Sequence, residues 1–309
     1  MVIAESLRSK LETVFGQLQP DCTLFSGGLD SSIAAALSGC KTGILVTLGN
    51  EAPDIEHARR VASALDMDII HRVVDFQEAI EAIPDVIRIL RSFDPAIPND
   101  VTVYFGLKEA HMRGFRSVMT GDGADELFGG YSYMADLPDL NGYIRHLAGT
   151  MSFNSQSLGR HFDQHMMQPF LHPEIVDIAL GIPPSLKIRQ HDGKLTGKWI
   201  LRTAVKAILP EDELWQDKRP LETGSGMTAL NAALGSQISD EHFHDSRLAE
   251  NIHFFNKAHL FYYETYRTVV GKIPPRRASE DQCGGCAAGI PQYKGHCRIC
   301  GWTKGINYE

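Results

Sequence analysis

Apolar and polar residues alternate in two patterns along the first 120 residues. Short apolar runs predict strands at Cys22–Phe25, Gly43–Leu48, Asp68–Val74 and Arg116–Met119. Longer amphipathic runs predict helices at residues 1–15, Leu29–Ser38, Asp54–Leu65, Phe76–Arg91 and Asn99–Arg113. Strands that alternate with helices indicate right-handed βαβ units, in which helices cover both faces of a parallel sheet. The pattern therefore predicts an α/β fold whose ligands bind beyond the carboxyl ends of the strands.

The pattern changes in the second half of the chain. Residues 135–270 are mainly helical and are divided by prolines, residues 271–282 have the composition of a linker, and four of the six cysteines follow. We expect one large domain over residues 1–270, a linker over 271–282, and a small module over 283–309.

Charge and hydropathy exclude some classes of protein. The net charge of −8 argues against a surface devoted to nucleic acid or anionic membrane, although a local basic patch is compatible with it. No apolar run approaches the roughly 20 residues of a membrane span, and the first residues lack the apolar core of a signal peptide. We expect a cytoplasmic protein with no membrane partner.

A glycine- and serine-rich loop follows the first predicted strand and opens the next helix. It reads Ser26-Gly27-Gly28-Leu29-Asp30-Ser31-Ser32. Its glycines let backbone N–H groups approach phosphate oxygens, its serines add hydroxyl donors, and the helix start offers free N–H groups. An ordinary βα turn with a serine cap is the alternative, but the position between strand and helix favours a phosphate-binding loop.

The carboxylate of Asp30 would repel a triphosphate unless a cation lay between them. A Mg²⁺ ion held by Asp30 and the phosphates resolves this conflict. The Gly-Lys-Ser/Thr ending of Walker-type loops is missing, which disfavours simple transfer of the γ-phosphate.

A second loop, Thr120–Tyr131, follows the strand at 116–119 and carries three carboxylates. Asp122, Asp125 and Glu126 would repel one another on a bare turn, and a nearby metal–phosphate complex would relieve the repulsion. Asp125 is therefore a second candidate ligand of Mg²⁺, while Asp122 or Glu126 is a candidate to position or deprotonate a nucleophile. The alternative is a solvated acidic turn with a helix cap.

Together, the runs SGGLDSS and TGDGADELFGGY resemble the synthetase domain of asparagine synthetases, within the PP-loop ATP pyrophosphatases. Further runs resemble that domain in the same order: 48–54, 81–94, 168–171, 175–180, 198–205 and 214–226. The resemblance covers roughly residues 20–230 and assigns the domain over 1–270 to the PP-loop type.

The resemblance implies that a carboxylate attacks the α-phosphorus of ATP, pyrophosphate leaves, and an amine or ammonia opens the acyl-adenylate. Residues 26–32 would hold the pyrophosphate, with Mg²⁺ on Asp30 and Asp125. Lys218 matches the family lysine that stabilises charge on the α-phosphate, a role that suits a mobile point charge. Three positions match residues that contact the nucleotide in the family: Leu24, Thr47 and Gly121.

The chain also departs from the family pattern. The loop begins after 25 residues, so we expect no glutaminase domain, and nitrogen from free ammonia, another amine or a separate glutaminase subunit. Asp122 stands where the aspartate-using enzymes usually have glutamate, and His172 replaces the aspartate after Phe-Leu. The run His165–Gln168 replaces a Glu-Ala-Arg-Val run, and losing its arginine removes the usual clamp for a carboxylate. The resemblance therefore supports the adenylation chemistry more strongly than it supports aspartate as the substrate.

The last four cysteines form two CxxC pairs. Cys283 with Cys286 and Cys297 with Cys300 predict a structural zinc site of four thiolates, because each pair forms a knuckle that points two sulfurs one way. Disulfides are disfavoured in the cytoplasm, and an iron–sulfur cluster or a redox pair is an alternative.

The role of this tail has two readings. It has a modest excess of Lys and Arg, and its aromatic residues Tyr293, Trp302 and Tyr308 would suit RNA contact. The other reading, which we favour, is a zinc ribbon that packs on the body or joins copies into a homo-oligomer.

Three functions compete. The first is an amide-forming ligase that adenylates a small carboxylate. The second is a PP-loop enzyme that adenylates a base of tRNA, and the third is a nucleotide-binding protein without catalysis.

Overall fold

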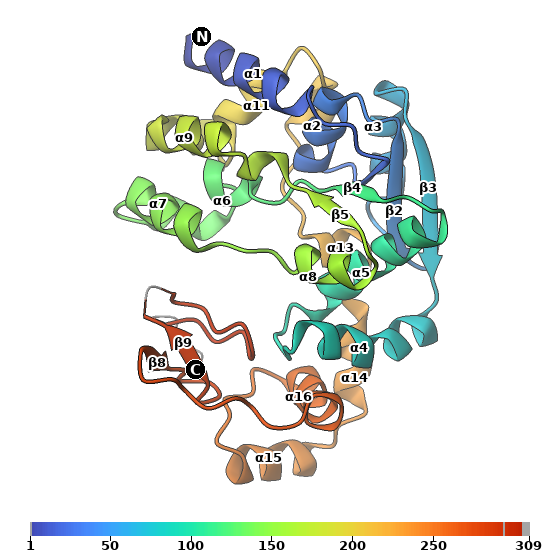
Figure 1. Ribbon diagram of the computed structural model, residues 1–309, viewed down its shortest axis with the longest axis vertical. Coiled ribbons are helices and arrows are strands. Elements are labelled where there is room, and N and C mark those ends of the chain that lie inside the picture. Colours follow the sequence, from blue (N-terminus) through green and yellow to red (C-terminus); the bar gives the residue numbers. More distant parts are fainter. Residues whose placement is uncertain (1, 293, 305–309) are drawn as a thin grey trace.

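Five strands form a parallel sheet in the order β3-β2-β1-β4-β5 (Figure 1). They are β1 Cys22–Leu24, β2 Thr42–Leu48, β3 Asp68–Val74, β4 Ser117–Met119 and β5 His165–Met167. The computed structural model describes residues 2–292 and 294–304. The chain leaves β1 toward β2 on one side and reaches β4 on the other. The space beyond the carboxyl ends of β1 and β4 is therefore a topological switch point, where ligands bind in such sheets.

Four helices connect the first four strands. They are α2 Leu29–Ser38, α3 Ile55–Ala64, α4 Phe76–Leu90 and α5 Ile97–Met112. The predicted α/β order is confirmed, with element ends shifted by one or two residues. The fifth strand was not predicted, because β5 is only three residues long and lies at the sheet edge with His165 exposed.

The two faces of the sheet are buried against different helices. Ile44 and Val46 of β2 belong to the apolar cluster of α4 and α5, whereas Leu45 between them belongs to the cluster of α2 and α3. Successive strand residues point to opposite faces, which explains the division. The apolar run along β2 is therefore the signature of a strand covered on both sides.

The remaining segments are mainly helical. They are α1 Val2–Phe15, α6 Ala124–Phe128, η1 Ser132–Asp136, α7 Leu140–Thr150, α8 Asn154–His161, η2 Pro169–Leu171, α9 Pro173–Gly181, α10 Pro184–Lys187, α11 Trp199–Val205, α12 Glu211–Leu214, α13 Leu221–Gly224, α14 Ala229–Ser236, α15 Asp240–Ala249 and α16 Lys257–Val269, with a short hairpin of β6 Arg189–His191 and β7 Lys194–Thr196. The predicted N-terminal helix is confirmed as α1. None of the helices within the described ranges is long and apolar enough to cross a membrane.

The cysteine-rich end packs on the body. Its hairpin pairs β8 Glu280–Gln282, the last residues of the expected linker, with β9 Gly289–Pro291. All four cysteines share one hydrophobic cluster with residues of α4, α5 and α16. Trp302 lies against the backbone of Gly284 and Gly285, while Tyr293 and Tyr308 lie outside the described residues.

Candidate active site and metal centre

The glycine loop is fixed by its own hydrogen bonds. The Ser32 hydroxyl donates to the carbonyl of Gly28 over 2.8 Å, and the Ser31 hydroxyl donates to the same carbonyl over 3.1 Å. Gly27 has φ +76°, and a β-carbon there would stand 2.6 Å from Cα of Ala58 in α3. Only glycine fits such a position without strain. The loop is therefore shaped before any phosphate binds.

The acidic loop lies directly against the glycine loop. A β-carbon at Gly121 would stand 2.7 Å from Cβ of Asp30 and 2.9 Å from its carbonyl carbon. Gly123 has φ +96° and precedes α6, which carries Asp125 in its first turn. These two glycines let the second loop bring Asp125 beside Asp30.

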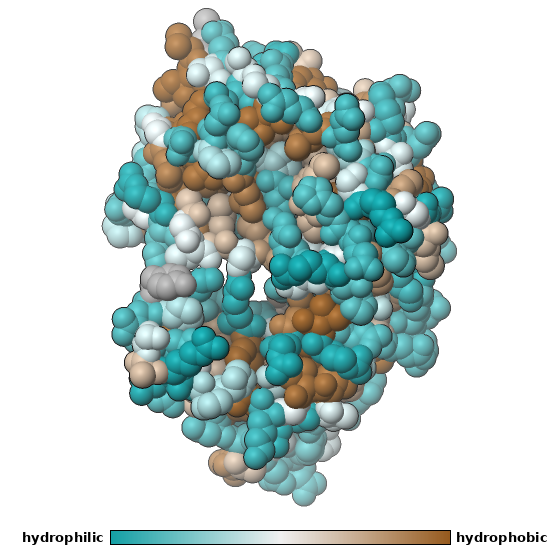
Figure 2. Space-filling view, viewed as in Figure 1, coloured by the Kyte–Doolittle hydropathy of each residue, from teal (hydrophilic) through white to brown (hydrophobic). Residues whose placement is uncertain are grey.

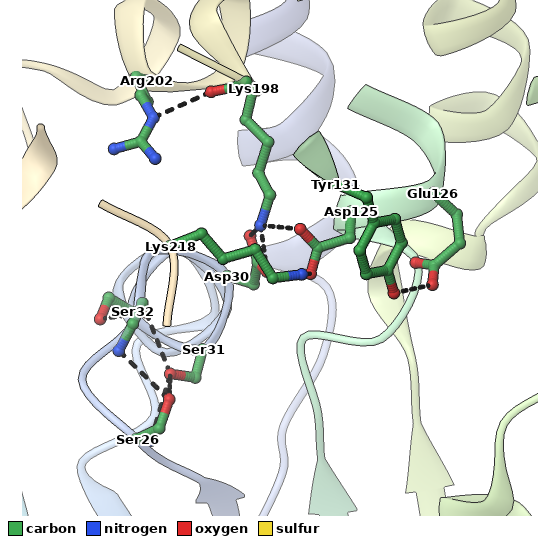
Figure 3. A network of polar contacts seen from close by, with 12 residues as sticks. Ser26, Asp30, Ser31, Ser32, Asp125, Glu126, Tyr131, Lys198, Arg202 and Lys218 are labelled. Atoms are coloured by element: carbon green, nitrogen blue, oxygen red, sulfur yellow. Dashed lines mark hydrogen bonds and ion pairs between the residues drawn. The ribbon is translucent and has the colours of Figure 1, made fainter. Parts of the chain in front are cut away.

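Two lysines bind this pair of carboxylates (Figure 3). The Lys198 ammonium lies 2.8 and 2.6 Å from the two carboxylate oxygens of Asp30, and 2.7 Å from Oδ1 of Asp125. The Lys218 ammonium lies 2.6 Å from Oδ2 of Asp125. We call these four residues the charged centre. Its two positive charges offset its two negative charges.

Burial makes these contacts strong. The Lys198 side chain is only 5% exposed, and although burial disfavours its charge, Asp30 and Asp125 raise its pKa above the ordinary value. Burial also acts against the charge of Asp125, but Lys198 and Lys218 hold the pKa of that carboxyl below its ordinary value. At Asp30 burial has the larger effect and raises the pKa of the carboxyl, although Lys198 acts in the opposite direction.

Lys218 enters the centre along the ring of Tyr131. Its ammonium lies 3.9 Å from the ring centre, and the Tyr131 hydroxyl donates to Oε1 of Glu126 over 2.7 Å. Burial raises the pKa of the Glu126 carboxyl. A carboxyl with a raised pKa is suited to exchange protons near neutrality.

Asp122 is held by neutral donors. Its Oδ2 accepts hydrogen bonds from the hydroxyls of Thr120 (2.8 Å) and Ser155 (2.6 Å), and from the amide of Gln168 (2.7 Å). These bonds fix the orientation of the carboxylate. Gln168 belongs to the run in which this chain departs from the asparagine synthetases.

A cavity of about 640 Å³ opens above these groups, which is a size typical of ligand sites. The predicted site residues that line it are Leu24, Ser26, Gly28, Leu29, Asp30, Ser31, Gly121, Asp122, Asp125, Glu126 and Lys218. Gly27, Ser32 and Thr47 lie outside the lining. The hydroxyl of Thr47 is buried and contacts His71 over 2.8 Å. Contact of Gly27, Ser32 and Thr47 with a nucleotide stays a prediction.

One end of the cavity is apolar. Leu24 and Val46 meet α5 at Gly106, where a β-carbon would stand 2.8 Å from Cδ2 of Leu24. This end suits a flat base, while the charged centre lies where phosphates would be held.

The donor set around Asp30 and Asp125 fits Mg²⁺. Both carboxylates line the cavity, and carboxylate oxygens are ligands that Mg²⁺ prefers. Lys198 already supplies one positive charge between them. The two residues would hold the ion on the side that faces the phosphates.

Lys198 begins the run at 198–205 that resembles the family, but the sequence alone assigns it no role. Its backbone lies in the left-handed region at φ +54°, at the N-cap of α11. Arg202, one turn later, lines the same cavity. The available signal was a lysine at the start of a helix in a run that resembles the family.

The four cysteine sulfurs converge on one point. Sγ of Cys283 lies 3.6 Å from that of Cys300, Sγ of Cys286 lies 3.8 Å from that of Cys297, and all four lie within 4.8 Å of one another. Zinc–sulfur bonds of about 2.3 Å place the sulfurs of a tetrahedral site about 3.8 Å apart. The geometry fits one tetrahedral ion, and a cluster of several irons would need more widely spaced sulfurs.

Comparison with known proteins identifies a matching family and several similar proteins. The family described as asparagine synthase matches residues 4–168 and 165–270. The chain is 30% identical to a probable asparagine synthetase (glutamine-hydrolyzing) of Dictyostelium discoideum over 86% of this chain and 56% of that protein. It is 28% identical to asparagine synthetase B (glutamine-hydrolyzing) of Escherichia coli over 98% of this chain and 58% of that protein.

A third relative, asparagine synthetase (glutamine-hydrolyzing) 1 of Saccharomyces cerevisiae, is 28% identical over 79% of this chain and 52% of that protein. The chain thus spans about half the length of the relatives it matches. The matched family covers both loops, Lys198 and Lys218. The chain belongs to the asparagine synthase family.

Proposed function

We propose that the protein is an ATP-dependent ligase that activates a small carboxylic acid as its adenylate and then forms an amide. The observation that carries this proposal is the charged centre, in which Lys218 contacts Asp125 at the wall shared by the glycine loop and the acidic loop. Family membership supports the same chemistry.

In the first step, an oxygen of the acid attacks the α-phosphorus of ATP. The new bond joins that oxygen to phosphorus, the bond to the bridging oxygen breaks, and pyrophosphate leaves. The glycine loop would hold the pyrophosphate through backbone N–H groups. Lys218 would follow the negative charge that develops on the α-phosphate, because an ammonium on a long stem can move between partners.

In the second step, ammonia or an amine attacks the acyl carbon. A carbon–nitrogen bond forms, AMP leaves, and the nitrogen loses a proton. Glu126 or the oriented Asp122 would take that proton. Mg²⁺ on Asp30 and Asp125 would neutralise phosphate charge during the first step.

The acid differs from aspartate in this proposal. The family arginine is replaced by Met167, which packs against the apolar cluster of α1 and α9. A second carboxylate would therefore lack its usual partner there. The nitrogen comes from free ammonia, an amine or a separate glutaminase subunit, and the reaction takes place in the cytoplasm.

The cysteine-rich end is proposed as a zinc ribbon over 283–309, joined to the PP-loop domain of 1–270 by the linker 271–282. A structural role for Zn²⁺ follows from the four buried sulfurs, which leave no position for a reacting water. Packing against Gly284 and Gly285 within the ribbon, rather than contact with RNA, accounts for Trp302.

The test is to incubate the protein with α-labelled ATP, Mg²⁺ and pools of carboxylic acids with ammonia, or with tRNA, and to measure AMP. AMP that requires one acid and ammonia supports the ligase. AMP that requires tRNA instead supports adenylation of an RNA base and overturns the proposal. If ATP binds and no AMP forms under any condition, the protein is a nucleotide-binding protein.

A further inference from the structure

We propose that the second cysteine knuckle, Cys297–Cys300, positions one wall of the ligand cavity through Arg298 and Ile299. A metal at the four sulfurs would then act at the cavity as well as on the module that holds it. The proposal rests on the proposed function only for its kinetic readout, and its structural readout is independent of it.

The first contact joins the knuckle to residues 92–96, which connect α4 to α5. The backbone N–H of Phe93 donates to the carbonyl of Ile299 over 2.7 Å, and the Ser92 hydroxyl donates to the same carbonyl over 3.3 Å. Ser92 and Phe93 are buried. A short, buried backbone bond of this kind fixes both partners in place.

Packing reinforces this contact. Gly301 has φ +77°, and a β-carbon there would stand 2.6 Å from Cδ of Pro95. The His296 ring lies 3.0 Å from Oδ2 of Asp94. Ala96, which follows Pro95, lines the cavity, as does Asn99 in the first turn of α5.

The second contact reaches the segment before α8. Nη2 of Arg298 donates to the carbonyl of Ser152 over 3.1 Å. Phe153 and Ser155 follow and line the cavity, and the Ser155 hydroxyl is one of the donors that orient Asp122. Arg298 thus contacts Ser152, which lies three positions before the serine that holds a candidate catalytic carboxylate.

The two contacts belong to one ring of interactions. Asn154 donates to both carboxylate oxygens of Asp100 on α5 over 3.1 and 3.0 Å, which ties the start of α8 to the helix that the first contact holds. Figure 2 shows this face hollowed between the cysteine-rich module and the elements above it. The knuckle therefore contacts both segments that this ring of interactions joins.

A metal would fix the knuckle by binding both of its sulfurs. Without a metal, the carbonyl of Ile299 and the side chain of Arg298 would lose their fixed support, and residues 92–96 and 152–155 would open locally. The opposite face of the sheet packs on clusters that do not include the module, around α1, α2, α3 and α9, so the sheet should keep its structure.

Hydrogen exchange tests this directly. In zinc-loaded protein two hydrogen-bonded amides should exchange slowly, that of Phe93 and that of Gln156, which donates to the carbonyl of Phe153 over 3.2 Å. Chelation should speed their exchange at least about tenfold while β2 and β3 stay protected. Unchanged exchange at Phe93 after the metal has left would overturn the proposal. So would equal loss of protection in β2, because it would mean that the metal supports the whole fold.

The kinetic test uses Arg298→Ala. Loss of one charge-assisted bond should raise KM for the acid identified in the AMP assay about fivefold, with kcat and KM for ATP within about twofold. Arg298→Lys should restore part of the loss, because lysine can donate to the same carbonyl. Arg276→Ala is the matched control, since Arg276 donates to a carbonyl within the linker, that of Glu280.

Metal content must match among these variants. Unchanged KM together with unchanged exchange at Gln156 would overturn the role of Arg298. If the wild-type protein makes no AMP, the proposed function fails, and the exchange experiment still decides the present proposal.

Discussion

The charged centre gathers four side chains from distant parts of the chain, and the cysteine cluster gathers four from residues 283–300, but the two balance their charges in opposite ways. In the charged centre, two carboxylates meet two ammonium groups within 2.8 Å. In the cysteine cluster, four sulfurs that would each become negative as thiolates lie within 4.8 Å of one another. Like charges at that distance repel strongly in a buried site.

The first site is therefore complete without a ligand, whereas the second needs a cation. A preformed charged centre can bind Mg²⁺ and phosphate by exchanging partners around Lys218. The cysteine cluster has no such partner among the described residues, so its stability should follow its metal. Four predictions test this contrast.

The largest effect is expected from loss of the metal. Structural zinc sites contribute on the order of 10 kcal/mol of binding free energy, so Cys283→Ser or chelation should abolish stoichiometric metal and unfold the module. Metal analysis and thermal unfolding measure this. Cys40→Ser, at a buried cysteine outside the cluster, is the control and should keep the metal. Equal stability of loaded and stripped protein would remove the contrast.

The next effect concerns the buried lysine of the charged centre. Lys198→Met should lower the free energy of unfolding by about 3–5 kcal/mol, because it leaves two buried carboxylates without their shared cation. Lys206→Met, at an exposed lysine just after α11, should change it little.

Denaturant unfolding measures both variants. Adding Asp125→Asn to Lys198→Met should recover part of the loss, since one uncompensated charge is removed. A double variant less stable than Lys198→Met would contradict a charge-based account of the centre.

Replacing Lys218 should lower activity strongly and stability little, whereas replacing Lys198 should lower stability. Its side chain is 28% exposed, so Lys218→Ala should leave stability and ATP binding nearly unchanged. AMP formation should fall about 10²–10³-fold, because a donor to the transition state is lost. Lys194→Ala, at an exposed lysine paired with Asp217, is the control. Preserved turnover in Lys218→Ala would remove the proposed role.

The smallest effect, counted per pH unit, is expected at Asp100, which lies between the two sites on α5. Burial raises the pKa of this carboxyl to about 8, and Asp100 is only 2% exposed. The folded protein therefore holds a proton that the unfolded chain releases above its ordinary pKa. Between about pH 4 and 8, stability should fall with rising pH by at most about 1.4 kcal/mol per unit.

Asp100→Asn should flatten this slope, as measured by urea unfolding across that range. Asp245→Asn, at an exposed aspartate of α15, should leave the slope as it is. An unchanged slope in Asp100→Asn would show that Asp100 does not hold its proton in the folded protein.

Local patterns in the sequence determined much of this protein. Short apolar runs and amphipathic runs predicted the first four strands and the helices between them, because burial on one or both faces acts on neighbouring residues. Short motifs with glycine, acidic residues and cysteines predicted both loops and the four sulfur ligands. These features depend on residues close to one another in the sequence, at most 17 positions apart for the cysteines.

The tertiary structure decided what joins these pieces. Lys198 binds Asp30 across 168 positions of sequence, and Ser92 meets Ile299 across 207. Gln168 reaches Asp122 from the loop after β5, a three-residue edge strand that was not predicted. No local pattern specifies such contacts, because they depend on which strand ends meet at one edge of the sheet and which helices pack across it.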